Sequence, residues 1–202
     1  MPFVKSGETS HLRVEPRRSA GALTSADPET RWNAARAIGI DADAVPQLAA
    51  ALRAEPVPRV REAIITALMR IGDEASIAAL MACLRSPDAG LRTACLDALR
   101  AMPQAILPFL ASALEDHDSD VRIMATELAR SVPPADANRL LCKLLEGERH
   151  ANVCAVAIDV LAEVGTSDAI PALQKCAERF RTTAFLPFAA SIAIARISGT
   201  EG

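Results

Sequence analysis

The sequence has few of the residues on which sheets and active sites depend. In 202 residues there is no Tyr, one Trp and 3% aromatic residues, although half of the chain is hydrophobic. Ala, Leu, Ile and Val therefore carry the apolar content, a composition that favours closely packed helices over sheets. With 22 basic against 25 acidic side chains, the chain also lacks the positive field that general nucleic-acid binding requires, so we expect no nucleic-acid partner.

Long hydrophobic runs are missing too. No apolar run reaches the ~20 residues of a membrane span, and the first 26 residues hold no apolar stretch of the secretory kind. We therefore expect a cytoplasmic protein without membrane insertion. The five cysteines include no Cys-x-x-Cys and are odd in number, which argues against a disulfide framework.

Catalytic motifs are absent as well. The chain has no Gly-rich phosphate loop and no Gly-x-Ser-x-Gly, and its three histidines show no metal-binding spacing. We expect no catalytic residue, no metal and no cofactor, and we do not expect a small-molecule ligand.

What the sequence does have is an internal repeat of about thirty residues. In each copy an apolar residue, usually followed by Arg, precedes small or apolar residues four, seven and eight places later, which is one face of a helix. After a break at Gly or Pro, a second helical pattern follows, so the unit is helix, turn, helix. The equivalent positions, with spacings of 30, 31, 30, 32 and 33, are Thr30, Val60, Leu91, Val121, Val153 and Leu186.

Stacked two-helix units of this length resemble HEAT repeats, especially the short bacterial kind first associated with phycobilin-attachment proteins. The marks of the resemblance are the recurring Val-Arg-x-x-Ala stretch, Ile71-Gly72-Asp73, and the Ala-Ile-Pro-Ala-Leu of residues 169–173. It covers roughly residues 18–198. The resemblance implies an all-α fold, a right-handed α-α superhelix (HEAT-repeat solenoid) of about five helix pairs plus terminal capping helices.

The repeat also predicts how the chain is divided. Residues 1–16 lie outside the pattern and are expected to form an N-terminal arm, and residues 17–202 a single HEAT-repeat domain in which 17–25 close the N-terminal end. The predicted repeats and the C-terminal cap are 27–57, 58–87, 88–117, 118–149, 150–180 and 184–198.

The repeated arginines are interpreted as structural rather than as a basic stripe for a partner. In families of this kind, an Arg near the start of the first helix pairs with a nearby Asp, and such pairs form a ladder from unit to unit. The residues expected in this ladder are Arg31, Arg61, Arg92, Arg122, Asp88 and Asp118.

The fifth repeat departs from the pattern, because Cys154 takes the Arg position and His150 and Asn152 introduce the helix. Two interpretations stay open. The three residues form a partner-specific or thiol-reactive spot, since a Cys near a helix N-terminus can have a lowered pKa; or the repeat has drifted, with Asn152 as a helix cap and Cys154 as a small filler.

A partner is expected on the concave face, which the second helices line in stacks of this kind. The predicted surface is a shallow apolar trough with a basic rim, suited to a helix or an extended peptide that carries acidic groups; the alternative is that its alanines only favour helix. The residues of this surface are Arg53, Ala79, Ala82, Arg85, Phe109, Ser112, Arg139 and Lys175.

These features predict a non-enzymatic scaffold or adaptor that binds another protein or a peptide. The stretch His-x-Asn-Val-Cys, residues 150–154, is similar to one in some small bacterial HEAT proteins that look like accessories of chemotaxis or two-component signalling. The alternative that the resemblance implies is a phycobilin lyase-like protein that attaches a chromophore or acts as its chaperone.

Overall fold

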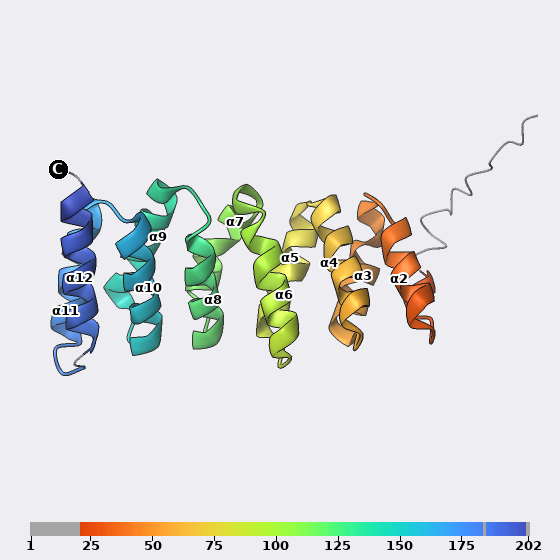
Figure 1. The fold of residues 1–202 in the computed structure, drawn as a ribbon, viewed down its shortest axis with the longest axis horizontal. Helices are drawn as coiled ribbons and strands as arrows, with labels where there is room; N and C mark the ends of the chain where they lie inside the picture. The colour runs from red at the N-terminus through yellow and green to blue at the C-terminus, as the bar shows by residue number, and fades with distance from the viewer. Residues whose placement is uncertain (1–20, 184, 201–202) are drawn as a thin grey trace, which may run out of the picture. The chain divides into compact units, whose positions relative to one another are not determined.

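A computed structural model describes residues 21–183 and 185–200 (Figure 1). Every regular element within these ranges is helical, so the predicted all-α fold of helix pairs is confirmed. The expectation of an arm at residues 1–16, and residues 17–20 of the expected half-repeat at 17–25, lie outside the described residues.

Helices of two kinds alternate along the chain, as the repeat predicts. The first helices are α2 (Pro28–Ala37), α4 (Pro58–Ile71), α6 (Ala89–Arg100), α8 (Ser119–Ala129) and α10 (Ala151–Val164). The second helices are α3 (Val45–Ala54), α5 (Glu74–Ala82), α7 (Pro103–Leu114), α9 (Pro134–Gly147) and α11 (Ile170–Arg179). The last helix is α12 (Phe185–Thr200), and the short 3-10 helices are η1 (Ala42–Ala44), η2 (Cys83–Arg85) and η3 (Ser167–Ala169).

Caps and prolines place the starts of these helices. Three first helices follow an Asp whose side chain accepts backbone N–H groups of the first turn, with distances of 2.9 to 3.4 Å. Four of the five second helices begin with Pro in the first turn, where a missing N–H costs nothing, and the fifth, α5, follows the capping residue Asp73. The three capping residues of first helices are Asp27, Asp88 and Asp118.

The chain divides into two compact units, the first ending at Ile71 and the second beginning at Gly72. The border falls inside the predicted repeat 58–87, between α4 and α5. We describe each unit separately, and the single domain at 17–202 stays a prediction.

Unit 1 is built on α4, against which α2 and α3 both pack. Its core consists of fully buried aliphatic side chains from all three helices, including Leu48, Ile64 and Leu68. Gly39 follows α2 with φ at +67°, a left-handed conformation that a side chain would strain, so the turn after α2 requires glycine there.

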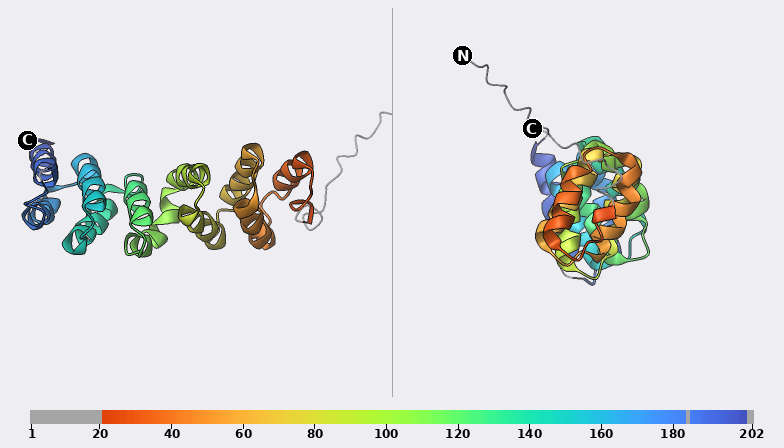
Figure 2. Two further views of the ribbon diagram at one scale, coloured as in Figure 1. Left: turned by 90° about the horizontal axis from the view of Figure 1, so that it is seen from below. Right: turned by 90° about the vertical axis from the view of Figure 1, so that its right-hand side faces the viewer.

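Unit 2 contains two rows of helices, which Figures 1 and 2 show from different directions. The first helices α6, α8 and α10 contact each other in series and α12 continues their row, while α5 packs on α7 and α9 on α11. Leu80, Leu99 and Leu110, on α5, α6 and α7, are fully buried between the rows.

Candidate functional site

One turn residue recurs just before each first helix. Its side-chain oxygen accepts the backbone N–H two residues later, at 2.7 Å for Glu148 and 3.2 Å for Ser25. This short contact fixes the turn that leads from one repeat to the next. The five equivalent residues, 30, 31, 30 and 32 positions apart, are Ser25, Glu55, Ser86, Asp116 and Glu148.

The repeated arginines close the same turns. Each guanidinium donates to the backbone carbonyl of the turn residue six positions earlier: Nη1 of Arg31, Arg92 and Arg122 at 2.7 to 2.8 Å, and Nε of Arg61 at 2.6 Å. A cation that binds carbonyls at a helix start holds the incoming chain against the helix that follows it. This local contact is what the Arg–x–x–Ala pattern encodes.

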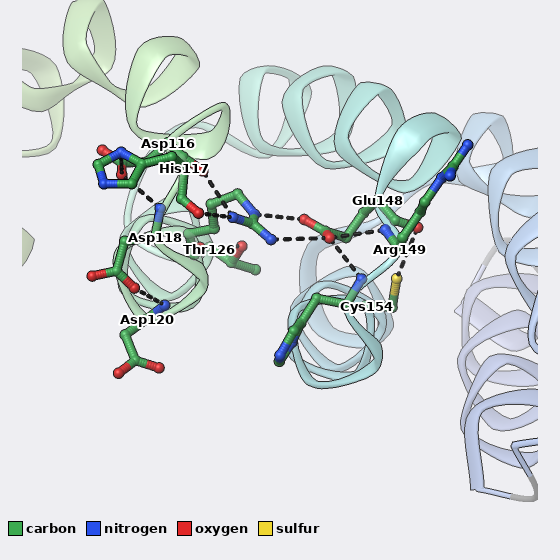
Figure 3. Close-up of polar contacts among 10 residues, drawn as sticks. Asp116, His117, Asp118, Asp120, Thr126, Glu148, Arg149 and Cys154 are labelled. Atoms are coloured by element: carbon green, nitrogen blue, oxygen red, sulfur yellow. Dashed lines mark hydrogen bonds and ion pairs between the residues drawn. The ribbon is translucent and has the colours of Figure 1, made fainter.

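Arg31 and Arg122 also bind a carboxylate, and in both cases it belongs to a Glu rather than to an Asp. Arg31 forms a bidentate pair with Glu55 at 2.7 and 2.8 Å, and Arg122 with Glu148 at 2.7 and 3.1 Å (Figure 3). Both partners are glutamates that follow the second helix of the same repeat. Asp88 and Asp118, which we expected in the ladder, cap the helices α6 and α8.

These pairs lower the pKa of both glutamates. Hydrogen bonds from Arg31 lower the pKa of Glu55 most, against the effect of burial. Burial raises the pKa of Glu148, but the hydrogen bonds from Arg122 and from the amides of His150 and Arg149 outweigh it, so its pKa is lowered as well. Both side chains are therefore ionised at neutral pH and fix the arginine orientations.

Cys154 makes the same contact as the arginines it replaces. Its Sγ lies 3.7 Å from the carbonyl oxygen of Glu148, again six positions earlier (Figure 3). The side chain is fully buried, and its hydrogen bond with Cys176, together with burial, raises the pKa of the thiol. These features favour the interpretation of Cys154 as a filler over that of a reactive thiol.

The other two residues of the fifth-repeat cluster do not gather around this thiol. His150 occupies the N-cap position of α10, and its side chain makes no capping hydrogen bond. Asn152 lies exposed in the first turn, so its expected role as the helix cap is wrong.

Four predicted partner-binding residues line one pocket between α5 and α7, which we call the α5–α7 pocket. It has a volume of about 230 Å³, and Met81 and Asp116 are among the other residues that line it. Ala79 lies half-buried on α5 outside it, Arg139 and Lys175 are exposed on α9 and α11, and Arg53 is exposed in unit 1. The four residues brought together are Ala82, Arg85, Phe109 and Ser112.

The rim of this surface is less basic than expected. Arg85 pairs with Asp116, whose side chain is 3% exposed, and Arg139 pairs with Asp136 at 3.0 Å. A partner meets neutralised pairs at these two places rather than free cations.

A larger pocket on the same face was missed by the sequence analysis. The α7–α9 pocket holds about 400 Å³ between the two helices, with a floor that includes Leu114, Leu140 and Leu144. Lys143 and Glu115 span its rim at 2.8 Å, and the buried pair of Arg122 and Glu148 closes one end. The small residues Ala111 and Gly147 were the available signal, because they leave room between neighbouring helices.

A pocket recurs at the equivalent place in unit 1. It holds about 710 Å³ beside α3, and Arg31 and Glu55 line it as Arg122 and Glu148 line the α7–α9 pocket. Ala54 takes the place of Gly147. The repeat therefore builds the same pocket twice. Each pocket lies between a buried Arg–Glu pair that closes a turn, Arg31–Glu55 or Arg122–Glu148, and small residues of a second helix.

Within the described ranges, no group of three His, Cys, Asp or Glu side chains is placed to hold a metal ion. No helix in this part of the chain is long and apolar enough to cross a membrane.

Solved structures similar to this chain include both engineered and natural proteins. An engineered protein is 21% identical, with 92% of this chain and 97% of that chain covered and a TM-score of 0.43. A designed armadillo repeat protein in complex with the peptide (KR)4 is 17% identical, with 91% and 100% covered and a TM-score of 0.44. The complex of CpcE and CpcF of phycocyanin lyase from Nostoc sp. is 20% identical, with 97% and 100% covered and a TM-score of 0.37.

At these identities the similar structures say nothing about function, and no curated protein matches the sequence. The model of the HEAT repeats matches residues 16–100 and 103–184, which is most of the chain. The sequence marks, the helix pairs and this match agree, and the chain belongs to the HEAT-repeat family.

Proposed function

We propose that this protein is a non-enzymatic scaffold that binds a helix or peptide of a partner protein along the second-helix face of unit 2. The observation that carries the proposal is that the α5–α7 and α7–α9 pockets lie on either side of α7 and share Asp116. Phe109 and Ser112 of α7 line the first pocket, while Ala111 and Leu114 line the second.

The chemistry of these pockets suits side chains of a peptide better than a polar metabolite. The α7–α9 floor is aliphatic, and the charges at its rim are already paired across 2.8 Å between Lys143 and Glu115. An amphipathic helix can place apolar anchors in neighbouring pockets at spacings of three, four or seven residues. Its polar residues then face a rim of both signs.

The test fills the α7–α9 pocket without disturbing the fold. A Cβ at Gly147 would meet no atom within 4 Å, and Leu favours helix over Gly by about 1 kcal/mol, so Gly147→Leu is expected to fold normally. Affinity capture from the native cell, followed by titration of the identified partner, should show at least tenfold weaker binding. The matched control is Thr93→Leu at an exposed site on α6.

Equal partner binding by Gly147→Leu and the control, with unchanged thermal unfolding, would rule out the α7–α9 pocket as the binding site. Arg85→Glu is unsuitable for this experiment, because it would set a second carboxylate against the buried Asp116.

The signalling role is a finer part of the same proposal. A cytoplasmic bacterial protein with this scaffold is proposed to bind a response regulator, a receptor or a kinase of a chemotaxis or two-component system. The proposal is supported by the resemblance of residues 150–154. Captured partners that include only chaperones would contradict it.

Chromophore attachment is the alternative that the family resemblance supplies. It predicts that the purified protein retains an added open-chain tetrapyrrole with a shifted visible absorbance. Retention that survives Gly147→Leu and is absent from an unrelated helical protein would favour this alternative over peptide binding.

A further inference from the structure

The last helix is apolar on two faces. Leu186, Ala190, Ala193 and Ile197 are buried, on the side where α12 packs against α10 and α11. On the other side Phe185, Phe188 and Ile192 are 49%, 68% and 42% exposed. The one other large hydrophobic residue exposed in the described part of the chain is Ile40 in unit 1.

The exposed face has the spacing of a helix-packing seam. Its residues recur at alternating intervals of three and four, the a and d positions of a heptad, which line up along one side of a helix. The seam, exposed throughout, is Phe185, Phe188, Ile192, Ala195 and Gly199. The whole seam spans fourteen positions, which is about 21 Å of helix surface at about 1.5 Å per residue, and its three large side chains span about half of that length.

The size of the side chains changes along this seam. Two phenylalanines stand at its N-terminal end, and Ala195 and Gly199 at its C-terminal end, where a Cβ added to Gly199 would meet no atom within 4 Å. Ile192 lies at the midpoint. The seam is therefore self-complementary in the antiparallel direction: bulky positions face small ones when the helix is turned about a two-fold axis through Ile192.

We propose that α12 pairs with α12 of a second copy of this chain, antiparallel, in a two-fold symmetric dimer. Phe185 then packs over Gly199 of the other copy, Phe188 beside its Ala195, and the two Ile192 side chains meet at the axis. This surface is distinct from the pockets on the second-helix face, so the proposal does not depend on the proposed function.

Charge does not oppose this pairing. Arg196 is the one ionisable residue in α12, and it lies four positions from Ile192. The two copies of Arg196 are therefore about 12 Å apart along the paired helices, at 1.5 Å per residue. That distance exceeds the Debye length of about 8 Å at physiological salt, so their repulsion is screened.

The area of the seam sets the expected strength. The exposed parts of Phe185, Phe188 and Ile192 amount to about 300 Å² per copy, from the 150 to 250 Å² that a large aromatic side chain can bury. Stable interfaces bury about 800 Å² per partner. We therefore expect a weak, concentration-dependent dimer with a dissociation constant on the order of 10 μM to 1 mM.

Sedimentation equilibrium of the full chain tests the proposal. The expected result is a rise of the weight-average mass from 21.3 kDa towards twice that value as concentration increases. Phe188→Glu is expected to keep the protein monomeric with unchanged thermal unfolding, because it changes an exposed side chain. Ile40→Glu, the matched control at the other exposed hydrophobic site, should leave the dimer intact.

A second pair of variants tests the antiparallel register. Gly199→Leu fills the space assigned to Phe185 and should weaken the dimer at least fivefold, and adding Phe185→Ala should restore part of the loss. Wild-type protein that stays monomeric up to about 1 mM overturns the proposal, whether the seam then binds another protein or nothing. A dimer that survives Phe188→Glu overturns it too.

Discussion

Replacing Arg122 by Ala should destabilise unit 2 far more than breaking an exposed ion pair in the same unit. Arg122 is 15% exposed and Glu148 6% exposed, and the guanidinium also donates to the carbonyl of Asp116 at 2.8 Å. The substitution removes the cation but leaves the carboxylate in place. Glu148 then keeps the amides of Arg149 and His150, at 2.8 and 2.7 Å, as its remaining partners.

The magnitude follows from these contacts. Removing one partner of a fully buried pair costs about 3 to 5 kcal/mol. Because Arg122 keeps some access to water and Glu148 keeps two amides, we expect the lower end, about 3 kcal/mol. Arg122→Ala combined with Glu148→Gln should recover roughly half of the loss, since no buried charge is then left without its partner.

Denaturant unfolding at pH 7, followed by the circular dichroism of the helices, measures the difference in free energy of unfolding between wild type and variant. The dependence of this free energy on denaturant concentration is compared as well, because a changed slope would indicate a change in cooperativity. The control is Glu115→Gln, which breaks the exposed pair with Lys143 and should leave the midpoint unchanged. If Arg122→Ala and Glu115→Gln have equal effects, the pair of Arg122 and Glu148 does not stabilise the turn.

The pH dependence supplies a second check on the same pair. The folded-state pKa of Glu148 is lowered, so its pairing contributes stability above the unfolded pKa of 4.5 that is lost as pH falls through the folded pKa. The difference between wild type and Arg122→Ala should therefore be full at neutral pH and shrink in acid. A difference that grows in acid would contradict this sign.

Three further outcomes follow from burial. Leu110→Ala, at a fully buried site in α7, should cost about 2 to 5 kcal/mol in the same unfolding assay, and a smaller loss would mean that the rows of unit 2 pack loosely. Alkylation of the native protein, read by mass spectrometry of peptides, should modify Cys142 before the other four cysteines, because it alone is partly exposed; faster labelling of Cys154 would revive its interpretation as a reactive thiol. Cys154→Arg, which restores the Arg of the other repeats, should lower stability by about 2 kcal/mol or more through overpacking, measured by denaturant unfolding.

The helix pairs could be predicted from the sequence because the repeat displays one face of each helix five times. Small or apolar residues stand four, seven and eight places after Val60, Leu91 and Val121, and this spacing fits a helix but not a strand. The turn residue could have been found in the same alignment, since Ser25, Glu55 and Ser86 stand six positions before an Arg. Its role was not evident from the sequence, because the position is occupied by Ser, Glu or Asp. These residues differ in size and charge, and what they have in common is a side-chain oxygen that accepts a hydrogen bond.

The carboxylate partners of Arg31 and Arg122 could not be predicted, because they depend on the length of each acidic side chain and on which Arg it can contact. Asp116 follows Arg92 by 24 positions, as Glu55 follows Arg31, but it is one methylene shorter and pairs with Arg85 instead. The α7–α9 pocket was missed for a similar reason. Its walls come from residues about thirty positions apart, and its volume depends on how closely α7 and α9 approach.

The fifth repeat shows how a repeat can lose its Arg and keep its turn. Cys154 donates to the carbonyl of Glu148 with a thiol, a weaker donor than a guanidinium. The missing cation is supplied from the following helix: Arg179 of α11 donates to the carbonyls of Leu145 and Glu146 at 2.5 and 3.1 Å, at the end of α9. Its guanidinium also helps to lower the pKa of Cys176, after the hydrogen bond with Cys154, to about 7. An Arg restored at position 154 would have to enter a site that is fully buried and already faces Arg179, so the Arg pattern of the other repeats is not the stable choice here.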